Sequence, residues 1–192
     1  MFPKSTGIER SFQYIRLITV TTVIGCLLFS GFVVVVSSRA SRALEANASG
    51  RKENISAEAR DHIRSFHQYF FSLEPDEKVI KANIARALYL ADASALRISD
   101  NLRENGYYVG VVAGNISQEV AVDSITLNID SYPFYFRCYA TERIIRPTSI
   151  VTRDLLSEGW LRYTARSDNN SHGFLIERWT ILDNHDLKVE SR

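Results

Sequence analysis

The longest hydrophobic pattern in the chain is an uninterrupted apolar run near its start. Residues 17–36 read LITVTTVIGCLLFSGFVVVV, with Arg16 just before the run and Arg39 shortly after it. These twenty residues carry no charge, and an α-helix needs about 20 apolar residues to cross the hydrocarbon of a bilayer. The run therefore predicts a single transmembrane helix over residues 17–38, flanked by Arg16 and Arg39.

Two other interpretations of this run stay open. The hydrophobic region of a cleaved signal peptide usually has about 7–15 residues, which is shorter, although SSRA at 37–40 resembles a weak cleavage site. A buried core helix of a globular protein seldom lacks a polar face over such a length. The membrane anchor is thus favoured, but basic residues are nearly balanced on the two sides, so the positive-inside rule does not fix its orientation.

Helical periodicity governs the next part of the chain. Residues 39–55 are small and polar without an apolar period, which predicts a linker, and Ser56 suits the N-cap of a following helix. Pro75 suits the first position of a second helix, and a third helix is expected from Ala93 to the stop signal Asn105-Gly106. The first two helices have apolar faces at steps of three and four: Ala59, Ile63, Phe66, Phe70 and Leu73, then Ile80, Ile84, Ala87, Leu88 and Ala91.

After Gly106 the pattern changes to short alternations of β-formers. Strands are predicted at 106–112, 118–130, 134–145, roughly 148–166 and 173–183. In 118–130 the apolar residues change phase, and a β-bulge near Asp123 would bring them to one face. Helices followed by antiparallel strands predict an α+β domain over residues 56–192, with about three helices packed on one face of a curved sheet.

Composition and charge narrow the functional classes only slightly. The net charge of +1 argues against a nucleic-acid-binding domain, which usually presents a basic face. The two cysteines, Cys26 and Cys138, lie in the apolar run and in a predicted strand, so a disulfide between them is implausible.

Candidate chemistry is sparse. The glycine signatures of nucleotide-binding loops and the nucleophile elbow are missing from the sequence. His62 and His67 are five residues apart rather than four, so they do not form a helical zinc pair and are interpreted as solvated surface histidines. Asp123 and Asp130 are better explained as solvated or turn-forming acids than as an acid–base pair. The sequence predicts no catalytic residue, no metal ligand and no cofactor.

The segment SDNNSHGF, residues 167–174, has the composition of an active-site loop but the position of a hairpin turn. Asp and Asn favour turns, and Gly173 supplies a positive φ. A catalytic His172 lacks a nameable partner. The residues alone therefore predict a hairpin loop between the last two strands.

The order of a short tail, one span, helices and strands resembles TraK of conjugative transposons over nearly the whole chain. TraK is similar to the VirB-eight-type inner-membrane assembly factors of type IV secretion systems. The blocks that carry the resemblance are IERSFQYIRL, AEARDHIRSFHQYFFSLEPD, NIARALYLAD, ENGYY, GNISQ, VDSITLNIDSYPF, RSDNN with GF, and ILDNHDLK.

This resemblance implies a non-enzymatic protein of the bacterial inner membrane. Residues 1–16 are then a cytoplasmic tail, and residues 56–192 a periplasmic domain of the cone-shaped, nuclear-transport-factor-two-like kind. The implied partners are other subunits of the transfer channel and a second copy of the chain, without direct nucleic-acid binding. A membrane-tethered enzyme or small-ligand binder, using the cleft of the cone, is the alternative function.

The resemblance also gives the turn a possible function. The wider family carries Asn-Pro-x-Gly and an aromatic residue before its last strand, and this motif is linked to self-association and partner contact. Asn170, Gly173 and Phe174 match the motif, whereas Ser171 replaces the proline and its fixed φ. An interaction turn is thus expected at Asn170, Gly173 and Phe174, with a simple hairpin loop as the alternative.

Overall fold

The computed structural model of the protein describes residues 6–192, which divide into one compact unit up to Arg51 and a second from Lys52 to Arg192. Helix α1, Thr6–Phe71, contributes to both units. It is the one helix among the described residues that is long and apolar enough to cross a membrane, with a mean hydropathy of 2.3 over its most apolar window. Arg16 and Arg39 are both exposed on it. Length and composition thus agree with the predicted span.

The helix start predicted at Ser56 is wrong, because residues 39–55, predicted as a linker, are helical and belong to α1. The segment lacks proline and is rich in Ala and Arg, which favour a helix. Its missing apolar period means only that no face of the helix is buried there. The division of the chain into span, linker and domain stays a prediction.

Three shorter helices follow, α2 (Glu77–Tyr89), α3 (Ala93–Glu104) and α4 (Tyr107–Ala113). Asp76 caps α2 by accepting hydrogen bonds from the backbone N–H groups of Lys78 at 2.7 Å and Val79 at 3.2 Å, so Pro75 lies before the cap and not at the first helical position. The predicted end of α3 is confirmed, with Gly106 at φ 73° directly after Asn105.

Helix α4 replaces the strand predicted for residues 106–112, which is therefore wrong. The tyrosines and valines of this segment favour a strand, but Gly106 in the left-handed region starts a new helix there. The Tyr107 hydroxyl donates to Oε1 of Gln118 at 2.5 Å, and Val111 is buried. Tertiary packing decides the conformation of this short segment against its local preference.

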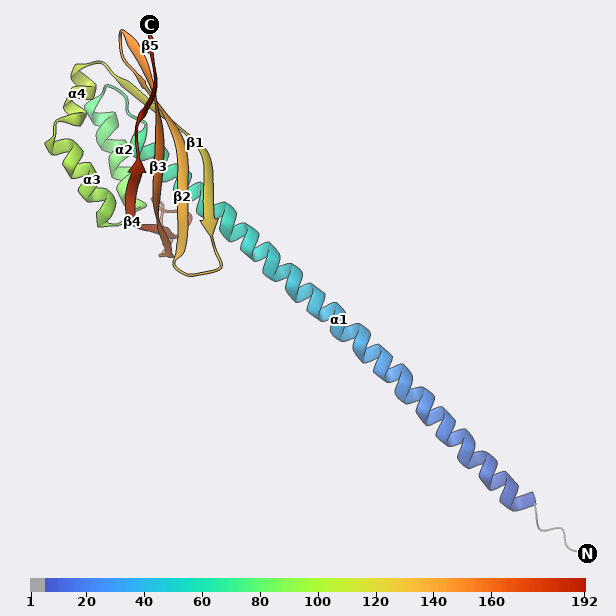
Figure 1. Cartoon of the computed structure of the whole chain (residues 1–192). Coiled ribbons are helices and arrows are strands. Elements are labelled where there is room, and N and C mark those ends of the chain that lie inside the picture. Colours follow the sequence, from blue (N-terminus) through green and yellow to red (C-terminus); the bar gives the residue numbers. More distant parts are fainter. Residues whose placement is uncertain (1–5) are drawn as a thin grey trace, which may run out of the picture. The chain divides into compact units, whose positions relative to one another are not determined.

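The sheet contains β1 (Ser117–Asn128), β2 (Phe134–Ile145), β3 (Ser149–Tyr163), β4 (Phe174–Asp183) and β5 (Asp186–Ser191). All pairings are antiparallel in the order β1-β2-β3-β4, and β5 pairs with the start of β3. Figure 1 shows α2, α3 and α4 together on one side of this sheet. The α+β fold class is confirmed, and so is the bulge, which lies between Val122 and Ser124.

The core forms where the last turns of α1 meet the sheet. Phe66 and Phe70 place their rings 4.8 and 4.9 Å from the ring of Trp179 on β4. Rings at such spacings and tilts add stabilisation beyond the area they bury. Phe66 and Phe70, both on the predicted apolar face, are buried, and so is Phe71.

His62 and His67 belong to the same core, so their expected exposure is wrong. Both are 0% exposed, because α1 is covered on more of its circumference than the apolar residues alone indicate. His62 Nε2 donates to the Leu90 carbonyl at 3.1 Å, and His67 Nδ1 donates to the Ile63 carbonyl at 2.7 Å. His67 Nε2 then accepts from the Ser157 hydroxyl at 2.6 Å. Burial lowers the pKa of each imidazole to about 4, so both are neutral at neutral pH.

Candidate functional site

The turn between β3 and β4 is held by the side chain of Asn170. This side chain is buried, and its Nδ2 donates to the Phe174 carbonyl at 2.7 Å while its Oδ1 accepts from the Gly173 N–H at 3.1 Å. The backbones of Ser167 and Asn170 also exchange two hydrogen bonds of 3.0 Å. Asn170 therefore closes the turn from inside, as a short amide side chain in a turn commonly does.

Gly173 has no room for a side chain. Its φ is 71°, which confirms the predicted positive φ, and a Cβ atom there would lie 2.8 Å from Cγ of Arg166 and 3.2 Å from the Thr164 carbonyl oxygen. The side-chain bonds of Asn170 and this conformation define the turn without the proline that Ser171 replaces.

Phe174 is a core residue. It is 1% exposed and stacks on Tyr163 with ring centroids 5.3 Å apart. Asn170, Gly173 and Phe174 are thus brought together, but they shape the turn from within. The surface that a partner could touch comes from the exposed residues Ser167, Asp168, Asn169 and Ser171.

Two side-chain contacts fasten the turn to α1. His172 Nε2 lies 3.0 Å from Oδ2 of Asp61, and a guanidinium nitrogen of Arg166 lies 2.8 Å from Oε2 of Glu58. Sequence reasoning found no partner for His172, because Asp61 lies on a distant helix. A nucleophilic hydroxyl or thiol is not hydrogen-bonded to this pair in the described part of the chain, so the pair lacks the third member that nucleophilic catalysis needs.

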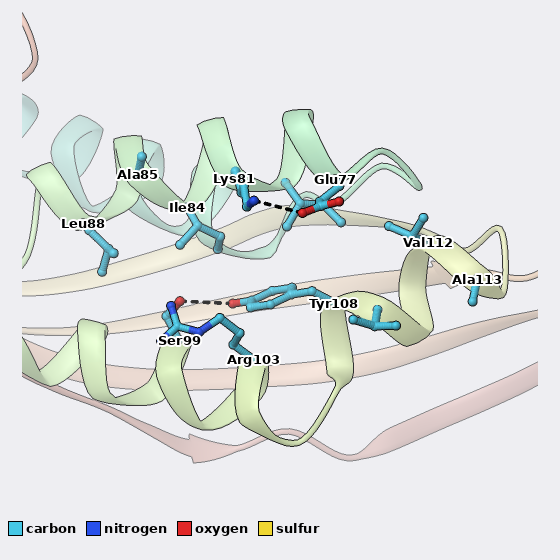
Figure 2. A pocket seen from close by; sticks show the side chains of 12 residues that line it. Glu77, Lys81, Ile84, Ala85, Leu88, Ser99, Arg103, Tyr108, Val112 and Ala113 are labelled. Atoms are coloured by element: carbon cyan, nitrogen blue, oxygen red, sulfur yellow. Dashed lines mark hydrogen bonds and ion pairs between the residues drawn. The ribbon is translucent and has the colours of Figure 1, made fainter.

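A second surface feature is an apolar groove of about 500 Å³ between α2 and the α3–α4 segment. Figure 2 shows Ile84 and Leu88 of α2 on one side and Tyr108 and Val112 of α4 on the other. Val109, on the same groove, is 71% exposed. Exposed apolar surface that is gathered in one place is typical of interaction sites. Sequence reasoning missed the groove because it treated residues 106–112 as a strand.

The rim of this groove is charged. Glu77 and Lys81 form an ion pair of 2.9 Å, and Arg103 pairs with Asp100 at 2.8 Å. The hydroxyls of Ser99 and Tyr108 lie 3.4 Å apart inside the groove (Figure 2). An apolar floor with a charged rim fits an amphipathic protein segment, which would bury its apolar side and keep its polar side in water.

The acids considered as a catalytic pair have separate partners. Asp123 accepts from the Thr141 hydroxyl at 2.9 Å, and Asp130 pairs with Lys52 at 3.1 Å.

A different group, Asp154, Asp183 and His185, brings its ligand atoms within 4.8 Å of one another on the surface. Hydrogen bonding to Asp183 raises the pKa of His185, which favours the imidazolium over the neutral form that binds metals. The ion pair of 3.0 Å between His185 and Asp183 accounts for the short distance between these two side chains without a metal ion.

Comparison with known proteins shows which solved structures have a similar fold. The chain matches no protein-family model and no curated protein. Among solved structures it is similar to the soluble domain of TrwG of the type IV secretion machinery from Bartonella grahamii, with a TM-score of 0.55, 17% identity, and coverage of 68% of this chain and 95% of that domain. A TrwG component from Bartonella birtlesii matches with a TM-score of 0.53, 13% identity, and coverage of 70% and 90%. The chain therefore shares the fold of the soluble domain of this secretion component.

Proposed function

We propose that the protein is a single-span inner-membrane assembly protein of a conjugative type IV secretion apparatus, of the TraK kind. The observation that carries the proposal is a fold shared over 95% of the TrwG soluble domain, in a chain whose first helix is long and apolar enough to cross a membrane. Residues 1–16 then lie in the cytoplasm and residues 39–192 in the periplasm. The protein acts by contacting other channel subunits and a second copy of itself.

Two surfaces support a role in protein contacts. The turn around Asn170 is held in one shape by buried hydrogen bonds and presents exposed polar residues, and the groove between α2 and α4 presents apolar ones. A rigid polar feature and an apolar groove are both common parts of protein interfaces. In this role the protein carries out no chemical reaction. The contact between His172 and Asp61 positions the turn against α1.

The orientation can be tested by reporter fusions. Alkaline phosphatase fused after Arg192 is expected to be active, because that enzyme matures only in the periplasm, whereas a green fluorescent protein at the same point should stay dark after export. Phosphatase fused after Arg16 serves as the matched control and should be inactive. The reverse pattern of signals would place the domain in the cytoplasm and overturn the proposed topology.

The role of the turn in transfer can be tested with a pair of substitutions. Gly173→Val is expected to lower the population of the native turn relative to other turn conformations roughly fivefold to 150-fold, and with it the frequency of DNA transfer and the yield of crosslinked complexes. A β-branched residue at positive φ is strained by about 1–3 kcal/mol, and each 1.4 kcal/mol is a factor of ten. The added atoms also meet Arg166 and the Thr164 carbonyl.

His172→Ala is the companion variant. It removes one partly exposed contact with Asp61, and even an ion pair at such a position is worth at most about 1 kcal/mol, so transfer should change little. Circular dichroism of both variants shows whether the domain is folded. If His172→Ala abolished transfer in a folded, associating protein, the loop would have a chemical role and the assembly proposal for it would fail.

A further inference from the structure

One charged side chain lies in the buried row of β2. Alternate residues of this strand face the core, and the row reads Phe134, Phe136, Cys138, Ala140, Glu142 and Ile144. Glu142 is 1% exposed although it takes the place of an apolar residue. Burying a carboxylate is unfavourable unless something compensates it, so its surroundings are informative.

Two amides and one arginine surround the Glu142 carboxylate. Asn184 Nδ2 donates to Oε2 at 3.1 Å, and Gln118 Nε2 donates to Oε1 over a long 3.4 Å. Arg153 is the residue opposite Glu142 on β3, but its guanidinium pairs with Asp186 at 2.7 Å. A carboxylate has about four acceptor positions, so the two amide contacts leave part of its hydrogen-bonding capacity unused.

The same carboxylate lines a cavity of about 210 Å³, which we call the Glu142 cavity. Its apolar wall includes Phe70 and Phe71 from the end of α1, Leu102 from α3 and Ile181 from β4. An apolar cavity of about 150 Å³ holds benzene, so this one has room for a slightly larger molecule. Polar groups converging on one end of an apolar cavity are the usual design of a small-ligand site.

The charges around the cavity select the sign of the ligand. Arg153 also lines the cavity, but its guanidinium forms an ion pair with Asp186 at 2.7 Å, so the two carboxylates of Asp186 and Glu142 share a single cation. Burial raises the pKa of Glu142, against the smaller opposing effects of the Asn184 hydrogen bond and the Arg153 charge, so the ionised form is incompletely compensated. A cation placed beside it would favour the ionised form and use its free acceptor positions.

We propose that the Glu142 cavity binds a small organic monocation with an apolar body, of the size of an aromatic primary amine. The ammonium group donates to Glu142, and the apolar body packs against Phe70, Phe71 and Ile181. Ligand binding in the Glu142 cavity is independent of the proposed assembly role. Because a protonated Glu142 must ionise when the cation enters, binding releases protons at pH values below its pKa and weakens as the pH falls.

The test uses the full chain in lipid nanodiscs, with empty nanodiscs as the blank. Benzylamine is the probe, and benzyl alcohol and benzoate are its neutral and anionic counterparts. Saturation-transfer NMR and calorimetry are expected to show saturable binding of benzylamine, with at least tenfold weaker binding of the other two. Binding of benzyl alcohol as tight as that of benzylamine, or absence of saturable benzylamine binding, would overturn the proposal.

Variants assign the binding to the cavity. Glu142→Gln keeps the shape but removes the charge and should weaken benzylamine binding at least tenfold. Glu119→Gln is the matched control, because Glu119 is an exposed residue of the neighbouring strand that pairs with Arg143. Leu102→Phe fills the cavity while Glu142 stays in place, so it tests the site if Glu142→Gln unfolds. Unchanged affinity in Leu102→Phe would contradict the proposed location.

Discussion

Acidification from pH 7 to pH 4 is expected to destabilise the domain by several kcal/mol, because His62 and His67 must become charged inside the core. The pKa of each is lowered from 6.5 to about 4 in the folded chain. One pKa unit corresponds to about 1.4 kcal/mol, so each histidine contributes up to about 3 kcal/mol. The unfolded chain binds more protons between these values, so stability is complete above about pH 6.5 and falls as the pH decreases toward 4.

Other titrating groups also contribute to this profile. The pKa of Asp92 is lowered below 3.8, so its contribution is lost only at lower pH. The raised pKa values of Glu142 and His185 act in the opposite sense, because the folded state favours their protonated forms. The net loss is therefore smaller than the sum for two histidines.

Denaturation by urea at several pH values measures this effect, with the fluorescence of the two tryptophans as the signal, since the ring of Trp179 packs on Phe66 in the core. In His67→Gln the protein should be less stable at pH 7, because the bonds to Ile63 and Ser157 are disturbed, and its pH dependence should be about half as steep. His185→Gln, at an exposed histidine, is the control. A profile that keeps its full slope in both His62→Gln and His67→Gln would show that other groups cause acid unfolding.

Asn170→Ala is expected to lower the free energy of unfolding by about 2–6 kcal/mol and to reduce DNA transfer strongly. The substitution leaves the buried Gly173 N–H and Phe174 carbonyl without their partners, and each unsatisfied buried group costs about 1–3 kcal/mol. Asn169→Ala changes the exposed neighbour and should stay within about 0.5 kcal/mol of the parent. Urea denaturation and mating assays on the two variants give the comparison.

Asn170→Asp separates the two bonds of the side chain. A carboxylate still accepts from Gly173 but cannot donate to the Phe174 carbonyl, and the two oxygens repel each other. This variant should therefore be at least as damaging as Asn170→Ala. Normal stability in Asn170→Asp would mean that the bond to Phe174 does not hold the turn.

The strong periodic patterns of the sequence predicted most of the fold. The apolar residues from Ala59 to Leu73 share one face only in a helix, and the alternating residues of β2 share one face only in a strand. The phase change beside Asp123 located a bulge, and Gly173 could be assigned a positive φ because a hairpin needs such a residue. These are local rules, and the structure satisfies them locally.

What the sequence did not reveal depends on distant contacts. Tyr107 and Val111 favour a strand by themselves and become helical through their neighbours in the fold. A histidine in a helical sequence does not indicate whether its side chain is buried. The burial of His62 and His67 therefore follows only from the packing of α1 against the sheet. Strand β5 is short and fully exposed, so it lacks the alternation that reveals a strand. Glu142 was hidden for the converse reason, because a glutamate in a strand is normally expected to face water.

The contacts between the turn and α1 have a consequence for the folding of the domain during synthesis. Arg166 and Glu58 are separated by 108 positions in the sequence, and Phe66 and Trp179, which pack together in the core, are separated by a similar number. Such distant contacts slow folding, since the intervening chain must be ordered before they form. Because α1 is synthesised before β4, its aromatic residues remain uncovered until β4 has been made. Chaperones and proteases can reach them during that time. Truncation anywhere before β4 should leave a nascent chain that is degraded rather than a smaller stable domain.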